Sequence, residues 1–246
     1  MSSDRVILNP RVQPTHYSLQ LEPDLDALTF TCKEEIHLTI SDTTALTSVV
    51  LHSKEIHLED ASLRFASSGE TAVLEGVAYN LKATTVTLSF DKALPVGDAV
   101  LSISYRGILN ADMAGFYRSY YTDADGKKKT MASTQFESLD ARRAFLCVDE
   151  PAVKATFAVS ITLPAHLTAL SNMPETSTAY LPARHGVPYK KVGAPLPLSL
   201  FSLSPSSPHK EVALGVLPSL SSSPPLSPLS PLVRPLSRRD VPADLG

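Results

Sequence analysis

The sequence predicts an all-β fold, an antiparallel sandwich or saddle, followed by a disordered tail. Runs with apolar residues at every second position recur through much of the chain, as in strands with one buried and one solvent face. Turn signals separate these runs, and no amphipathic helix of useful length lies between them. The composition then changes to serine, leucine and proline. We therefore expect a β domain over residues 1–190 and a low-complexity tail over residues 191–246.

Each strand of the β domain is predicted from its own alternation. Before residue 110 the alternating runs are 17–21, 35–40, 55–58, 85–90 and 100–105. Asp125 and Gly126 favour a hairpin turn because they supply the positive φ angles that such turns need. This turn joins the aromatic run 116–121 to a return strand that begins near residue 127. Asp149, Glu150 and Pro151 interrupt the pattern before a further strand at 156–163.

The tail is predicted to lack regular structure. Eleven of the chain's 20 prolines lie between residues 192 and 246. Proline cannot donate a backbone hydrogen bond, so it is disfavoured inside helices and central strands. A segment of this composition is typical of disorder.

Composition and charge exclude several partners. With 246 residues, 43% of them hydrophobic, the chain is long enough to bury a core. A net charge of −3 argues against a nucleic-acid or anionic-membrane partner. We find no signal-like segment and no long apolar run, so we expect no membrane association. The two cysteines, Cys32 and Cys147, fit a reducing compartment and a cytoplasmic location. A single disulfide between them is the less favoured alternative.

Three groups of polar residues invite a functional interpretation that we do not favour. His52, Glu55 and His57 offer zinc-ligand chemistry, but His52 and His57 would point to opposite faces of a strand, so we expect solvent-facing side chains. The adjacent acids Asp149 and Glu150 are expected to end a loop beside Pro151. Arg142 and Arg143 could orient Glu137 or Asp140 by ion pairing, or stand on the surface. We favour a structural role for both arginines.

The stretch 130–154 holds the strongest candidate site. In a strand through residues 134–137, Gln135 and Glu137 would share one face and Phe136 would point to the other. A carboxylate and an amide on one face form a receptor for a small cation such as an α-ammonium group, because charge-assisted hydrogen bonds are strong. The pattern is common, so on its own it leaves two interpretations open, a solvated strand face, which the pattern alone favours, and a ligand site at Gln135 and Glu137.

The same stretch resembles the N-terminal domain of the M1 zinc aminopeptidases, with the puromycin-sensitive, cytosolic branch the most similar. The similarity runs from about residue 8 to residue 174. Its motifs are PTHY at 14–17, LEPD at 21–24, GFYRS at 115–119, MASTQFE at 131–137, DARRAF at 140–145, DEPAVKATF at 149–157 and LSNMP at 170–174. The resemblance implies that Gln135 and Glu137 help to hold the free α-amino group of a peptide substrate.

The parent activity implied by the resemblance is zinc-dependent release of N-terminal amino acids. Such enzymes hold zinc with a His-Glu-x-x-His motif, and this sequence contains no His-Glu dipeptide. The exopeptidase motif Gly-x-Met-Glu-Asn is absent too. We therefore expect a domain that ends before the catalytic domain, with no catalytic residue, no metal ligand and no cofactor of its own. The alternatives are a free-standing module that binds peptide N-termini and an interaction fragment that associates with a catalytic aminopeptidase domain.

Overall fold

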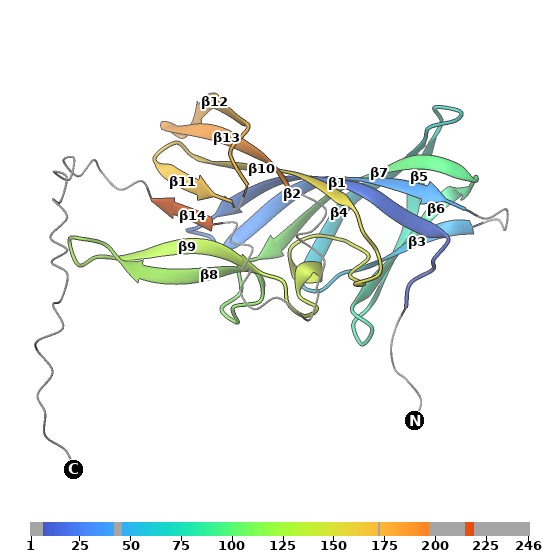
Figure 1. The fold of residues 1–246 in the computed structure, drawn as a ribbon, viewed down its shortest axis with the longest axis horizontal. Coiled ribbons are helices and arrows are strands. Elements are labelled where there is room, and N and C mark those ends of the chain that lie inside the picture. The colour runs from blue at the N-terminus through green and yellow to red at the C-terminus, as the bar shows by residue number, and fades with distance from the viewer. Residues whose placement is uncertain (1–6, 42–45, 172, 197–214, 219–246) are drawn as a thin grey trace, which may run out of the picture.

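The computed structural model describes residues 7–41, 46–171, 173–196 and 215–218. These residues form fourteen strands and one short 3-10 helix, η1 (Ala141–Arg143), which confirms the all-β prediction (Figure 1). The strands are β1 (Val12–Asp24), β2 (Thr29–Ile40), β3 (Leu46–His52), β4 (Ile56–Phe65), β5 (Thr71–Asn80), β6 (Thr85–Leu94), β7 (Gly97–Ile108), β8 (Gly115–Thr122), β9 (Lys128–Gln135), β10 (Thr156–Pro164), β11 (Leu167–Leu170), β12 (Ser177–Arg184), β13 (Val187–Leu196) and β14 (Gly215–Pro218).

Ten strands form one large sheet in the order β12-β13-β10-β1-β2-β7-β4-β5-β6-β3. Neighbouring strands are antiparallel except β1 and β10, which run parallel with His16 opposite Thr156 and Leu21 opposite Ile161. This parallel pair joins the start of the chain to the strand that follows the 130–154 stretch. The stretch is thereby fixed at both of its ends to ordered sheet.

A single hydrophobic core lies against one face of this sheet. Strand β2 shows the underlying alternation, since its buried positions are every second residue from Phe30 to Ile40. Buried side chains of β3 and β6, such as Leu51 and Leu88, belong to the same core. Strand β5 pairs with β4 near its start and with β6 along the rest of its length. It therefore links two layers, as a sandwich requires.

Several strands were not predicted from the sequence, some because their side chains do not alternate between buried and exposed and others because they lie beyond the expected domain boundary. Strands β5 and β12 are exposed along most of their length, so they carry no hydrophobic period. Strand β13 continues to Leu196, beyond the expected domain boundary at residue 190, and β14 lies within the expected tail. The remainder of that tail lies outside the described residues.

Four strands form a smaller sheet in the order β11-β14-β9-β8. The predicted hairpin between β8 and β9 is confirmed. The Asp123 carboxylate accepts hydrogen bonds from the backbone N–H groups of Asp125 and Lys127, and Gly126 has a φ of 78°. Figure 1 shows this hairpin reaching away from the large sheet, with β14 beside β9.

Candidate functional site

Gln135 is the last residue of β9 and lies opposite Gly115 of β8. Ala132 and Thr134 are buried whereas Gln135 is half-buried, so Gln135 belongs to the outer face of the strand. Phe136 turns the other way and packs edge-on against Phe145, with ring centroids 5.9 Å apart. The predicted separation of Gln135 from Phe136 is confirmed.

Glu137 does not lie on the strand, contrary to the expected shared strand face. Strand β9 ends at Gln135, and a turn follows in which the N–H of Asp140 donates to the carbonyl of Phe136 at 3.0 Å. Glu137 is exposed in this turn. Neither Gln135 nor Glu137 uses its side chain to bind another residue in the part of the chain that the structure describes. Both groups are therefore free to take a ligand.

Arg143 fixes the turn that carries Glu137. Its Nε donates to Asp140 Oδ1 at 2.9 Å, and its Nη1 pairs with Glu55 and lies 3.7 Å from Asp112 Oδ2. The Arg143 side chain is only 11% exposed, whereas its acidic partners reach the surface. Arg143 thus orients Asp140 and not Glu137, which leaves the Glu137 carboxylate without an internal cation.

Arg142 has the structural role that the sequence favours, but inside the protein. Its Nε donates to Asp149 Oδ2 at 2.9 Å, and its Nη1 donates to Thr84 Oγ1 at 2.6 Å. The N–H of Asp149 donates to His52 Nδ1 at 3.0 Å. His52 is 2% exposed, so the expectation of a solvent-facing imidazole is wrong. Burial, followed by the Arg142 charge, lowers the pKa of His52 to about 4.

A group of buried polar residues that was not predicted from the sequence holds the segment 144–148 against the core. Glu34 Oε2 accepts from the N–H of Leu146 at 3.2 Å, Tyr105 donates to the carbonyl of Ala144 at 3.1 Å, and Tyr17 accepts from the N–H of Val148. Burial raises the pKa of the Glu34 carboxyl well above its usual range. Extending the alternation of Ile36 and Ile40 backward along β2 would have placed Glu34 on the buried face.

No group of three histidine, cysteine or acidic side chains within the described ranges is arranged to hold a metal ion. Glu55, considered above as a zinc ligand together with His52 and His57, instead forms an ion pair with Arg143. Cys32 and Cys147 are buried and free, without a disulfide. In the part of the chain that the structure describes, no helix is long and apolar enough to cross a membrane.

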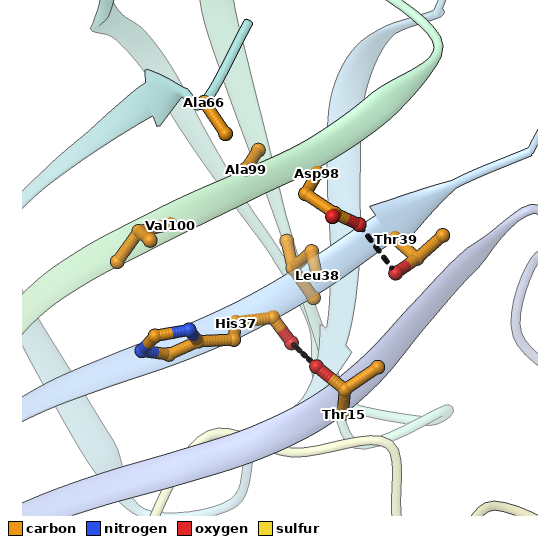
Figure 2. Close-up of a pocket in the computed structure, with 8 residues that line it drawn as sticks. All are labelled: Thr15, His37, Leu38, Thr39, Ala66, Asp98, Ala99 and Val100. Atoms are coloured by element: carbon orange, nitrogen blue, oxygen red, sulfur yellow. Dashed lines mark hydrogen bonds between the residues drawn. The ribbon is translucent and has the colours of Figure 1, made fainter. Parts of the chain in front are cut away.

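A pocket of about 290 Å³ lies elsewhere, on the large sheet (Figure 2). Three of its polar side chains, Thr15, Thr39 and Asp98, form hydrogen bonds with other residues that line it. Thr39 donates to Asp98 Oδ1 at 2.8 Å, and Thr15 donates to the carbonyl of His37 at 3.3 Å. Gln135 and Glu137 are not among its lining residues. The candidate site is therefore an open strand end and not this pocket.

The described features define a β-sandwich domain with a free amide, Gln135, and a free carboxylate, Glu137, at the base of the β8–β9 hairpin. The Peptidase M1 N-terminal domain family matches residues 13–189, and the chain belongs to this family. It is 44% identical over 163 residues to "Aminopeptidase M1" of Arabidopsis thaliana, an alignment that covers 65% of this chain and 18% of that protein.

Two further relatives show the same partial coverage. The chain is 39% identical over 170 residues to "Puromycin-sensitive aminopeptidase" of Caenorhabditis elegans, covering 68% of this chain and 18% of the relative. It is 43% identical over 173 residues to "Alanine/arginine aminopeptidase" of Saccharomyces cerevisiae, an alignment that covers 69% of this chain and 19% of that protein. The matched region is thus about a fifth of the length of these curated relatives.

Proposed function

We propose that this chain supplies the substrate-recognition part of an aminopeptidase, with Gln135 and Glu137 receiving the α-ammonium group of a peptide. The observation that carries the proposal is the free pair at the end of β9. Nearby acids such as Asp140 and Asp149 are bound by arginines, whereas Glu137 has no described partner. A free carboxylate two residues along the chain from a free amide suits a cationic ligand.

This pair accounts chemically for a preference for chain ends. A peptide's first nitrogen is an ammonium group that donates three hydrogen bonds and carries a positive charge. Every internal peptide nitrogen is a neutral amide with one donor, so it offers Glu137 no charge to pair with. A site built on this carboxylate therefore selects the N-terminus of a peptide.

The hydrolytic step is assigned to residues outside this sequence. Zinc in the parent family supplies a polarised water for peptide-bond cleavage. The described residues do not fit such a metal, since no suitable cluster exists among them and the sequence has no His-Glu dipeptide. The role of this chain's own residues is to bind and orient the substrate amine. The buried free thiols support a cytoplasmic location as part of this proposal.

A second function, association with a catalytic aminopeptidase domain, is favoured by two exposed apolar side chains. Met113 is 69% exposed in the loop before β8, and Leu139 is 54% exposed in the loop after β9. Because β8 and β9 are antiparallel, these loops flank the same end of the hairpin as Gln135. A partner that covers both side chains would meet the substrate site.

Isothermal titration calorimetry tests the recognition role with the hexapeptide Ala-Val-Lys-Val-Thr-Val and its N-acetylated form. Both peptides have the same side chains, and only the α-ammonium group differs. We expect saturable binding of the free peptide and at least a tenfold weaker binding of the acetylated one, about 1.4 kcal/mol or more. Equal affinity for the two peptides would remove the α-ammonium group from the site.

A further inference from the structure

Strand β14 occupies an unusual place in the smaller sheet. It lies between β11 and β9, although 18 residues of chain separate it from the end of β13 at Leu196. All four of its residues pair with β11, from Gly215 opposite Leu170 to Pro218 opposite Leu167. Only Val216 pairs with β9, opposite Ala132. The strand is therefore held mainly from one side.

Among the residues that the structure describes, most of the β9 edge next to β14 has no strand pairing. Strand β9 has eight residues, and Ala132 is its one partner for β14 in the described parts of the chain. Unpaired strand edges bind extended peptides through main-chain hydrogen bonds. We refer to the space between β9 and β11 as the strand slot.

The direction of β14 relates the slot to the candidate site. Strands β14 and β9 are antiparallel with Val216 opposite Ala132, so positions N-terminal to Val216 advance toward Gln135. A peptide in this register with its fourth residue opposite Ala132 has its first residue opposite Gln135. Glu137 lies two residues further along the chain, in the turn that follows β9. The peptide's α-ammonium group then reaches the end of β9 where both polar side chains lie.

We propose that the strand slot binds an extended peptide with a free N-terminus, and that β14 competes for it within the same chain. This inference rests on the proposed recognition role of Gln135 and Glu137 and adds how the rest of the peptide is held. The ligand is a peptide of at least five residues in β conformation, without proline at its fourth position. Main-chain pairing with β9 and β11 supplies affinity that is independent of most side chains.

Competition by β14 lowers the apparent affinity for the peptide. When a site is open for only a fraction of the time, the apparent dissociation constant increases by the inverse of that fraction. Release of β14 should therefore tighten peptide binding without any change in Gln135 or Glu137. Among the described residues, release breaks one residue pair with β9 and four with β11.

The test uses two proline substitutions in the full chain. Val216→Pro places proline in the middle strand of the small sheet, where the lost N–H and the ring oppose pairing. Val233→Pro makes the same change 17 residues further along the chain and serves as the control. We expect Val216→Pro to bind the free hexapeptide at least threefold more tightly than the wild type, and Val233→Pro to match the wild type. An unchanged dissociation constant for Val216→Pro would overturn the competition.

A second peptide separates this inference from the proposed function. Ala-Val-Lys-Pro-Thr-Val keeps the α-ammonium group but cannot pair in the slot at its fourth residue. We expect it to bind more weakly than the hexapeptide and equally to all three proteins. If both peptides bind equally well, the slot is disproved while N-terminal recognition stands. If neither peptide binds, the proposed function fails and this inference fails with it.

Amide hydrogen exchange measures directly how well the backbone N–H groups of β9 are protected from solvent. We expect faster exchange of β9 amides in Val216→Pro than in Val233→Pro, and renewed protection when the hexapeptide is added. Unchanged β9 exchange in Val216→Pro would show that β14 does not hold this edge, and would overturn the proposal.

Discussion

Gly115 and Gln135 lie directly opposite each other at the end of the β8–β9 hairpin, and Gly115 has a φ of +72°. A Cβ atom at residue 115 would lie 2.4 Å from Arg143 Cβ and 3.0 Å from the carbonyl oxygen of Asp140. The hairpin end that carries Gln135 is therefore packed against the turn that carries Glu137. Glycine allows both the backbone angle and this close approach.

Gly115→Ala should destabilise the fold more than a positive φ alone explains. Gly126 has a similar φ of +78°, but a Cβ there meets nothing within 4 Å, so Gly126→Ala is the matched control. We expect the control to lose about 1–2 kcal/mol and Gly115→Ala about 1–3 kcal/mol more from the added clash. Urea unfolding measures both free energies, and equal losses would contradict the tight packing.

Arg142→Met should cost about 3–5 kcal/mol of unfolding free energy, because it leaves the Asp149 carboxylate without its cation inside the protein. The two side chains of this pair are 9% and 11% exposed. Arg106→Met provides the control, since Arg106 pairs with Glu59 where the side chains are 61% and 37% exposed. We expect that control to lose less than about 1 kcal/mol. Similar losses in the two variants would show that burial does not decide the effect.

His52 should make the fold less stable as the pH falls. Its pKa is about 4 in the folded protein against 6.5 for a free imidazole, so the unfolded chain binds more protons between these values. Stability therefore decreases as the pH drops from about 6.5 to 4. His52→Asn keeps an acceptor near the Nδ1 position but does not titrate. Urea unfolding across this range should show the wild type losing stability relative to the variant, and parallel curves would contradict the lowered pKa.

Glu34 should have the opposite pH dependence. Burial raises its folded pKa well above 4.5, so the folded protein retains a proton that the unfolded chain releases. The resulting stability is complete below pH 4.5 and is lost as the pH rises through the folded pKa. Glu34→Gln keeps an acceptor for the N–H of Leu146 and does not titrate. Relative to this variant, the wild type should lose stability as the pH rises above 4.5, and a constant difference would contradict the buried acid.

The sequence predicts the strands whose side chains alternate and misses the others for a physical reason. Strands β2, β7 and β10 each bury every second residue, so local periodicity reveals them. Strand β12 is held by pairing with β13 and is exposed along its length, so nothing in its own residues marks it. The parallel pairing of β1 with β10 depends on residues about 140 positions apart, which local patterns do not report.

The candidate site was predictable in its residues but not in its geometry. Alternation placed Gln135 and Phe136 on opposite faces, as the structure has them. The end of β9 at Gln135 was not evident, because the turn at Glu137 depends on Arg143 and its pairing with Asp140 and Glu55. The burial of His52 likewise depends on its distant backbone partners Cys147 and Asp149.

The most direct test of the account measures whether the Glu137 carboxylate and the peptide's α-ammonium group act on each other. Calorimetry of the free and N-acetylated hexapeptide is carried out with the wild type, with Glu137→Gln and with Glu35→Gln, an exposed glutamate on β2. We expect acetylation to weaken binding at least tenfold in the wild type and in Glu35→Gln. In Glu137→Gln most of that difference should disappear, which is the coupling expected of a direct contact. An acetylation effect of the same size in Glu137→Gln would contradict the account.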